Sequence, residues 1–600
     1  MSNRSQGLTR RGLLAGTAAA GLVPWACTLA DEQSYLQAFF EASYQRQLAN
    51  SPQLQTSLGL ATGKDRWDRP GQEAARETQG ALQAELAAAD GFDRNALSPS
   101  DRLSLDVFRF ATRRQLAILD WRDHTLPISH MRGIHRTIPQ TLMSNHTIAN
   151  EEDARAYISR LEGVEPLLLE LTGEMERRAA LGTRVPLFAR EGVIATFENF
   201  GGGALAAGEG ENVIRADFRR KIGEAGFSGE VQRALLADAD AALAGPFRRG
   251  VDAVTGYLRN TAGEAPEESG AWTLPGGQDF YRAALEIETT LPVTADEIHE
   301  TGLSETARLH TALRAKMAEL GFAGDLQDFF AHLRDHPGFY FSNDDAGREA
   351  YLAEARAVLD EMYARLDGLF GRLPRAALEV RRVEPWLERS AGIAGYFPPS
   401  ADGSRPGVFL VNLYDMSRLP RYQLQALAYH EGVPGHHLEA AIARELEHLP
   451  AFRRTSGYTA FSEGWALYAE EIPEELGLYR DPWQQVGKLT MELMRAGRLV
   501  ADSGLHAKGW TRAQAAAWLE ANTADSSDVI SGAVNRYAVI PGQAVAYAAG
   551  KIAVMEMRSG AQARLGTRFD LSAFHDALLG EGPLPLPILR QQIEQWTATQ

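Results

Sequence analysis

Residues 424–437 read Leu-Gln-Ala-Leu-Ala-Tyr-His-Glu-Gly-Val-Pro-Gly-His-His, a helix-forming run that meets a break and three histidines. The chain holds only 14 histidines among 600 residues, so three of them within eight positions beside a glutamate are improbable by chance. Imidazole and carboxylate groups are ligands that zinc takes in proteins. The stretch therefore predicts a metal site at the end of a helix, and a plain helix end is the alternative.

The spacing of the histidines differs from that of the common zinc motif H-E-x-x-H, in which two histidines lie one helical turn apart. The step from His430 is six residues to His436 and seven to His437. Six residues turn a helix by about 600°, and seven residues carry the chain about 10 Å along its axis. Because zinc–nitrogen bonds are only about 2 Å long, neither pair could bind one ion on a regular helix.

The residues between the histidines predict that the helix is not regular here. Pro434 breaks the helix, since it lacks an N–H group and its ring clashes with the preceding turn. Gly432 and Gly435 permit unusual backbone conformations. We therefore expect the segment to bulge and to bring His436 to the metal, with His437 as the alternative ligand.

A third protein ligand is expected downstream, in the helical segment 458–472. Glu463 lies there among aromatic and aliphatic residues, where an unpaired carboxylate would be costly to bury. A glutamate facing water at a helix boundary is the alternative, and Glu439 and Glu470 are weaker candidates. Glu431 is placed to act as the base that activates a water molecule.

Composition narrows the class of protein. The formal net charge is −17, from 61 basic and 78 acidic residues, so we expect no binding to nucleic acid. The one cysteine, Cys27, excludes a thiolate zinc site in the folded part.

Paired arginines before a short apolar run predict a twin-arginine export signal at residues 1–30. Cleavage after Ala30 would give an exported periplasmic or secreted protein, and lipidation at Cys27 is the alternative.

Most of the chain has the pattern of amphipathic helices, and no stretch after the signal is long and apolar enough to span a membrane. The fold is predicted to be mainly α, with an N-terminal helical region at 31–270 and a catalytic helical region at 271–600. The Gly- and Pro-rich segment 261–278 marks the boundary. Helical spacing is clear at residues 33–49, 102–121, 151–180, 279–320 and 347–369.

Two short strands are predicted just before the histidines, at 378–383 and 407–412. They would form a small sheet within residues 378–412, beside the active site. The sheet could offer an edge strand to an extended peptide, with Asn412 as a substrate-binding residue. A purely structural hairpin is the alternative.

Four motifs carry a resemblance to a known family: HEGVPGHHLE (430–439), FSEGWALYAE (461–470), DSGLHAKGWTR (502–512) and RYAVIPGQAVAYAAGK (536–551). In this order they resemble the bacterial domain-of-unknown-function-885 family (DUF885). That family is similar to the helical zinc metallopeptidases typified by thimet oligopeptidase, angiotensin-converting enzyme and carboxypeptidase Taq. The resemblance implies a large helical fold with a cleft.

The resemblance also implies roles for individual residues. His430, His436 and Glu463 would bind one Zn²⁺ per chain, and Glu431 would serve as base and then as acid. In the related peptidases a tyrosine and a histidine from C-terminal segments stabilise the oxyanion. The matching candidates here are His506, Tyr537 and Tyr547, and Arg536 would bind a substrate carboxylate.

The function predicted on this basis is zinc-dependent hydrolysis of short peptides. One alternative is an exported peptide-binding protein with a degenerate, metal-free site. Glu431 argues against it, because a binding protein needs no base. The other alternative is a metallohydrolase of non-peptide amides or esters.

Overall fold

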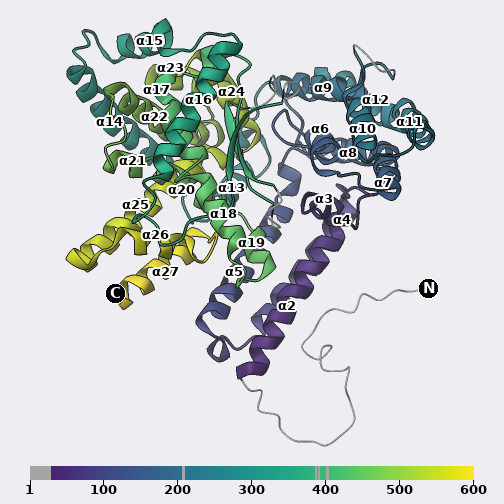
Figure 1. The fold of residues 1–600 in the computed structure, drawn as a ribbon, viewed down its shortest axis with the longest axis horizontal. Coiled ribbons are helices and arrows are strands. Elements are labelled where there is room, and N and C mark those ends of the chain that lie inside the picture. Colours follow the sequence, from purple (N-terminus) through teal and green to yellow (C-terminus); the bar gives the residue numbers. More distant parts are fainter. Residues whose placement is uncertain (1–28, 206–209, 385–387, 389–391, 401–404) are drawn as a thin grey trace, which may run out of the picture. The chain divides into compact units, whose positions relative to one another are not determined.

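The computed structural model describes residues 29–205, 210–384, 388, 392–400 and 405–600. This part of the chain is mainly helical and carries a small three-stranded sheet (Figure 1). Two compact units divide the chain, Met1–Ser269 and Gly270–Gln600. The predicted export signal, up to position 28 and including Cys27, lies outside the described residues.

The first unit is entirely helical in its main elements. They are α2 (Leu29–Asn50), α3 (Pro52–Ser57), α4 (Gln72–Asp90), α5 (Pro99–Asp120), α6 (Ile134–Pro139), α7 (Glu151–Glu162), α8 (Val164–Ala180), α9 (Leu187–Gly201), α10 (Val213–Glu224), α11 (Gly229–Ala242) and α12 (Arg248–Asn260). The predicted helices at 33–49 and 102–121 fall in α2 and α5, whereas 151–180 is divided at Gly163 into α7 and α8.

The second unit contains the sheet and the remaining helices. Its elements are α13 (Gly277–Thr289), α14 (Ala295–Glu319), α15 (Leu326–Asp335), α16 (Asp345–Tyr363), β1 (Leu378–Arg382), β2 (Ala394–Phe397), β3 (Gly407–Val411), α17 (Arg421–Glu431), α18 (His436–Glu445), α19 (Ala451–Thr455), α20 (Thr459–Ala469), α21 (Glu471–Glu475), α22 (Pro482–Ala507), α23 (Arg512–Asn522), α24 (Ser527–Val539), α25 (Ala546–Leu565), α26 (Leu571–Leu579) and α27 (Leu586–Thr599).

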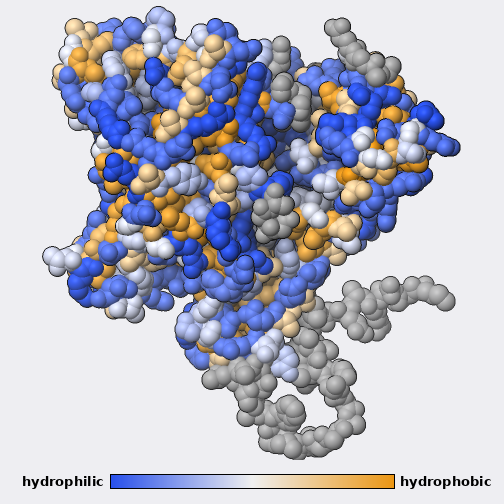
Figure 2. All heavy atoms as spheres, viewed as in Figure 1, coloured by the Kyte–Doolittle hydropathy of each residue, from blue (hydrophilic) through white to orange (hydrophobic). Residues whose placement is uncertain are grey.

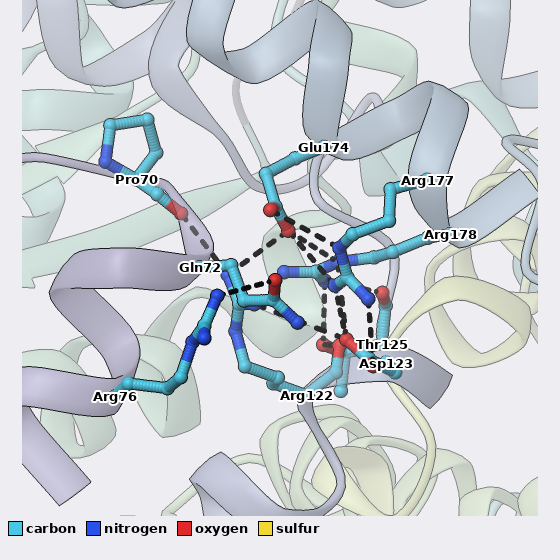
Figure 3. Close-up of polar contacts among 9 residues, drawn as sticks. All are labelled: Pro70, Gln72, Arg76, Arg122, Asp123, Thr125, Glu174, Arg177 and Arg178. Atoms are coloured by element: carbon cyan, nitrogen blue, oxygen red, sulfur yellow. Dashed lines mark hydrogen bonds and ion pairs between the residues drawn. The ribbon is translucent and has the colours of Figure 1, made fainter.

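A network of ion pairs joins α8 to the segment that follows α5 in the first unit (Figure 3). Arg177 donates to Asp123 Oδ2 at 2.9 Å and to Glu174 Oε2 at 3.0 Å. Arg122 approaches the same Glu174 oxygen at 3.1 Å and donates to the Pro70 carbonyl. Burial raises the pKa of Glu174, but the arginines, first Arg177, outweigh this effect and lower the pKa. Each charge here has a partner, so the network is structural.

Helix α22 starts at a well-defined N-terminal cap. The Asp481 carboxylate accepts from the Trp483 N–H at 2.9 Å, and the Gln484 side chain accepts from the Asp481 N–H at 3.1 Å. Pro482 fills the first helical position, where its missing N–H costs nothing. These residues fix the beginning of the helix on which α17, the helix that carries His430, packs.

Helices α14 and α17 both pack along α22. On the α17 side, the Gln423 amide donates to Thr490 Oγ1 at 3.1 Å, and Gly487 lies against the Tyr422 carbonyl. The two contacts place the first turns of α17 directly against α22. A buried cluster that includes Leu313, Phe329 and Leu493 fills the space between α14, α15 and α22.

The sheet has the strand order β1-β3-β2. Both predicted strands are present as β1 and β3, but they run parallel, with Leu378 opposite Gly407, so they do not form the hairpin considered as an alternative. Strand β2 pairs antiparallel with β3, with Tyr396 opposite Phe409. It was not predicted because its sequence, Ala-Gly-Tyr-Phe, has no β-branched residue and no alternating pattern.

Helix α20 packs on α25 through two facing glycines. A Cβ on Gly464 would lie 2.5 Å from Gly550 Cα, and a Cβ on Gly550 would lie 2.0 Å from the Ala460 carbonyl oxygen. Larger residues would force the helices apart. The contact therefore fixes α20, which carries Glu463, against α25, which carries Tyr547.

Hydrophilic residues cover much of the face shown in Figure 2, with apolar patches between them. Within the described ranges, no single helix is both long and apolar enough to span a membrane. The segments Ser527–Val539 and Gln543–Arg568 meet the length and composition criteria only as a pair, and that pair is bent by 120°.

Asp502 of α22 is fully buried and ties α13 to the turn that precedes α25. Its Oδ1 accepts from the Tyr281 hydroxyl at 2.7 Å and from the Gly542 N–H at 3.0 Å. Its Oδ2 has no hydrogen-bond partner in the described part of the chain. Burial raises the pKa of Asp502 to about 7, although the two hydrogen bonds act to lower it.

An Asp502→Asn substitution should therefore change how stability depends on pH. The native carboxyl keeps a proton up to about pH 7, whereas the unfolded one loses it near pH 4. The wild-type free energy of unfolding then falls as pH rises through this window, by up to about 4 kcal/mol from this group. The asparagine keeps an acceptor for both donors and has no such proton.

Urea unfolding of both proteins at several pH values between about 4 and 8 measures the effect. The stability of the variant relative to wild type should rise with pH and level off above about pH 7. A difference that stays constant over the whole range would show that Asp502 has no raised pKa.

Candidate metal centre

The helix break predicted from the sequence is present between α17 and α18. Helix α17 ends at Glu431 and α18 begins at His436, so residues 432–435 are non-helical. The Gly435 N–H donates to the Tyr429 carbonyl at 3.0 Å, and the His437 N–H donates to the Gly432 carbonyl at 3.0 Å. The chain thus folds back on the end of α17, and the next helix starts at its side.

Gly435 is the residue that this return requires. A Cβ at position 435 would lie 2.0 Å from the His430 carbonyl oxygen and 2.4 Å from that of Tyr429. The indole Nε1 of Trp465 donates to the Pro434 carbonyl at 3.0 Å and holds the segment from the α20 side. The backbone contact on one side and the indole hydrogen bond on the other hold residues 432–435 in this conformation.

The break brings together three groups that could bind a metal: His430, His436 and Glu463. Glu463 Oε2 lies 3.6 Å from His430 Nε2 and 3.4 Å from His436 Nε2. Ligands bound about 2.0–2.2 Å from a tetrahedral zinc ion lie roughly 3.3–3.6 Å from each other. The distances and the donor types therefore fit a zinc ion at this position.

The state of Glu463 supports the same interpretation. Its Oε2 is buried and has no hydrogen-bond partner among the described residues. Burial raises the pKa of Glu463, but His430 and His436 outweigh this effect and hold it well below the usual value. An ionised, buried oxygen that accepts no hydrogen bond is costly unless a cation binds it.

His430 is oriented by a second carboxylate. Its Nδ1 lies 2.9 Å from Glu470 Oε1, which directs Nε2 toward Glu463. Burial lowers the pKa of His430, but Glu463 and Glu470 outweigh it and raise the pKa to about 9. A carboxylate on the far nitrogen of a histidine is the usual support of a metal ligand.

His436 is supported by a hydroxyl on α20. Its Nδ1 lies 3.4 Å from Ser462 Oγ, and Ser462 in turn donates to Glu439 Oε2 at 3.0 Å. Glu439 is buried and Ser462 separates it from the ring of His436. Glu439 and Glu470, weaker ligand candidates in the sequence, thus lie one contact away from the three-residue group.

The alternative ligand, His437, points elsewhere. Its Nδ1 lies 3.0 Å from the Tyr396 hydroxyl, and its Nε2 lies 3.1 Å from the Ala376 carbonyl. Both ring nitrogens are thus used by the sheet and its flanking loop. Tyr396 of β2 also stacks on the ring of His436, with 6.4 Å between ring centroids.

Glu431, the predicted base, is buried at the end of α17, next to His430. Burial raises the pKa of its carboxyl, whereas His436, His430 and Arg495 act to lower it. A raised pKa favours a carboxyl that takes up and releases a proton near neutral pH.

Two other predicted residues are engaged by the fold itself. His506 is fully buried, accepts from the Ala271 N–H at 3.0 Å through Nδ1, and has Nε2 3.0 Å from the Tyr537 carbonyl. The Asn412 amide donates to the Glu388 carbonyl at 2.7 Å and accepts from a backbone N–H. The structure therefore does not bring either side chain to the group of His430, His436 and Glu463, because backbone groups already use their polar atoms.

The remaining predicted residues form one cluster on α24 and α25. Arg536 Nη2 donates to the Tyr547 hydroxyl at 3.0 Å and also donates to Gln543. Tyr537 is buried, and its hydroxyl has no hydrogen-bond partner within the described ranges. Burial raises the pKa of Tyr537, whereas Arg498 and Arg536 act to lower it.

Arg495 and Arg498, which lie on α22 near this cluster, were not predicted from the sequence. A signal for them was present, because they interrupt the otherwise apolar run Leu493-Met494-Arg495-Ala496-Gly497-Arg498-Leu499. Charged residues in a buried helical segment are rarely without a specific partner.

Comparisons with known proteins agree with this fold. The chain matches the family described as "Bacterial protein of unknown function (DUF885)" over residues 52–593. A crystal structure of a candidate lipoprotein from Colwellia psychrerythraea is 26% identical, with a TM-score of 0.89, covering 96% of this chain and 100% of that one.

A candidate lipoprotein of unknown function from Shewanella oneidensis is 16% identical, with a TM-score of 0.71, covering 93% of this chain and 99% of that one. At that identity the likeness concerns the fold alone. No curated protein matches the chain.

A Gly435→Ala substitution tests whether the close backbone contact sets the site. The added Cβ would meet two carbonyl oxygens at 2.0 and 2.4 Å, so we expect a loss of roughly 1–3 kcal/mol or more in stability. Gly560→Ala on α25 is the matched control, because a Cβ there meets nothing within 4 Å. That control should gain about 0.5–1 kcal/mol. Denaturant unfolding measures both, and equal effects would contradict the constraint at position 435.

Proposed function

The chain belongs to the family of bacterial proteins of unknown function called DUF885, and we propose that it is a zinc-dependent hydrolase of peptide bonds in short peptides. The observation that carries the proposal is the convergence of His430, His436 and Glu463 within 4.8 Å. The Glu463 oxygen at its centre lacks a hydrogen bond within the described residues, and Glu470 orients His430 from behind. A helix end without a function needs none of these features.

The chemistry divides between the metal and the protein. His430, His436 and Glu463 would hold the zinc ion, which would supply a Lewis acid at this position. Glu431 takes the proton of the attacking water and gives it to the leaving amine. Its pKa is raised by burial, which favours both transfers.

Tyr547 is our candidate for stabilising the oxyanion that develops on the scissile carbonyl. Its hydroxyl oxygen accepts a hydrogen bond from Arg536 at 3.0 Å, which leaves its own proton to be donated. Tyr537, whose hydroxyl has no partner among the described residues, is the second candidate. We assign His506 a positioning role, because its imidazole holds the Tyr537 backbone.

Metal content of the purified protein tests the proposal. Wild type should bind about one zinc per chain. His430→Ala, His436→Ala and Glu463→Ala should lose the metal, whereas His437→Ala and the exposed control His448→Ala should keep it. Glu431→Gln should keep the metal and lose hydrolysis of a peptide library. A wild type that takes up no zinc would refute the metallohydrolase, and a peptide-binding protein would then be favoured.

A zinc titration tests the role of the supporting carboxylate of Glu470. Because Glu470 orients His430 without belonging to the three-residue group, Glu470→Ala should weaken zinc affinity by about 10- to 100-fold. Glu447→Ala is the matched control, since that side chain is 80% exposed and should leave the affinity unchanged. An unchanged affinity in both variants would show that Glu470 does not support the site.

We also propose that the protein is exported. The support is the Arg10-Arg11 pair before an apolar run and the description of both structural relatives as candidate lipoproteins. A double Arg10→Lys, Arg11→Lys variant should remain in the cytoplasm, where cell fractionation would find it. Cys27→Ala should still be exported, and a loss of membrane association in that variant alone would assign Cys27 as a lipid anchor. Export of the double variant would refute a twin-arginine signal.

A further inference from the structure

Three buried guanidinium nitrogens on α22 have no hydrogen-bond acceptor in the described part of the chain: Arg495 Nε, Arg498 Nε and Arg498 Nη1. Arg495 Nη1 donates to the Met491 carbonyl at 3.1 Å, which fixes the side chain along the helix. A buried charged donor without an acceptor is costly. These three nitrogens are therefore free to donate to a bound anion.

Arg558, on α25, shows how this fold can satisfy a guanidinium group with a carboxylate. Its two Nη atoms donate to Glu475 Oε1 and Oε2 at 2.8 Å each. Such a fork satisfies the charge and the donors together. Arg495 and Arg498 have the donors for a carboxylate, but no described carboxylate lies within 4.0 Å of either.

A tyrosine holds a third arginine beside these two. The Arg498 guanidinium carbon lies 4.4 Å from the centre of the Tyr547 ring, and that of Arg536 lies 5.6 Å from it. Contact with the ring face stabilises the positive charge of a guanidinium group. It leaves the N–H donors in the guanidinium plane free to bind an anion. Arg498 and Arg536 therefore meet at one aromatic platform.

This cluster lies next to the metal-binding residues. Helix α17, which carries His430 and Glu431, packs on α22, which carries Arg495. The charge of Arg495 reaches both residues and acts to lower the pKa of each. The pKa of Arg536 shows the same proximity, because burial lowers it while Tyr547, Tyr537 and Glu463 raise it.

One acidic residue, Asp525, lies near the arginines without pairing with them. Burial raises the pKa of Asp525, whereas Arg495 and Arg498 act to lower it. No ion pair within the described ranges joins it to either guanidinium. Asp525 therefore does not occupy the guanidinium donors, which stay available to a bound anion.

We infer that Arg495, Arg498 and Arg536 bind the C-terminal carboxylate of the peptide, so that the enzyme cleaves near the carboxyl end of its substrates. The inference rests on the proposed hydrolase, whose metal-binding and base residues lie beside the arginines. Consecutive Cα atoms are only about 3.8 Å apart. An anchored carboxylate therefore places a bond one or a few residues upstream at the metal, and an internal segment of a long chain would lack the anchor.

Binding and cleavage together test this inference. The probes are N-acetyl-Ala-Ala-Ala with a free carboxylate, the same peptide as its C-terminal amide, and N-acetyl-Ala-Glu-Ala amide. Titration calorimetry on the full mature chain carrying Glu431→Gln measures Kd without turnover. The free acid should bind about 10- to 100-fold more tightly than its amide. Arg498→Gln and Arg495→Gln, each added to Glu431→Gln, should each reduce this preference at least several-fold.

Arg480→Gln in the same background is the matched control, because Arg480 is exposed and pairs with Glu361. It should keep the full preference for the free acid. Two arginine variants are used so that misfolding of one, seen by circular dichroism, leaves the other as a test. In hydrolysis assays with the unsubstituted protein, products should come from the carboxyl end, as judged by mass spectrometry.

Three results would overturn the inference: equal affinity for the acid and the amide, a preference that survives both arginine substitutions, or binding of the glutamate-containing amide as tight as that of the free acid. The last result would assign the arginines to an acidic side chain. If no peptide is hydrolysed but the acid preference holds and depends on the arginines, the carboxylate site stands and the hydrolase proposal fails. If peptides are hydrolysed but the free acid binds no more tightly than the amide, the hydrolase proposal stands and the carboxylate site fails.

Discussion

The backbone contact at position 435 determines where the metal-binding groups lie. The carbonyl oxygens of Tyr429 and His430 come so close to Gly435 that a side chain there has no space, and the chain leaves α17 sideways. His436 then begins a new helix, so its ring meets that of His430 at nearly a right angle, with 4.8 Å between centroids. A continuous helix could not achieve this, because residues six apart point in directions about 120° different.

The distribution of satisfied and unsatisfied charges follows from the same arrangement. Some buried ions of this unit are fully paired: Lys551 contacts Glu492 at 2.8 Å and also Glu471. At the site, Glu463 Oε2 and the Arg498 nitrogens lack hydrogen-bond partners among the described residues. Natural folds break the rule of pairing mainly where function requires it. The unpaired anion lies on α20 and the unpaired cations on α22, and both helices pack against α17 and α25. This is expected if a cation and an anionic ligand bind side by side.

Sequence reasoning reached the helix break and its histidines because local rules govern them. Proline and glycine act on their own backbone, so the interruption after Glu431 could be predicted without knowing the fold. The surroundings of His506 and Asn412 could not be predicted, because they depend on backbone groups distant in sequence, at Ala271 and Glu388. Strand β2 was missed for a related reason: β3 supplies its pairing, and its own residues have little strand propensity.

The packing of α17 on α22 links the proposed carboxylate site to the metal-binding residues. His430 and Glu431 lie on one helix, Arg495 and Arg498 on the other, and both helices are long enough to be stiff. The separation between a bound carboxylate and the reacting bond is then fixed by helix geometry, whereas a loop would let it vary. Sites built on regular elements hold their groups more accurately than sites built on loops. Because a shift of about 1 Å can cost a hundredfold in rate, this rigidity would itself select which bond is cleaved.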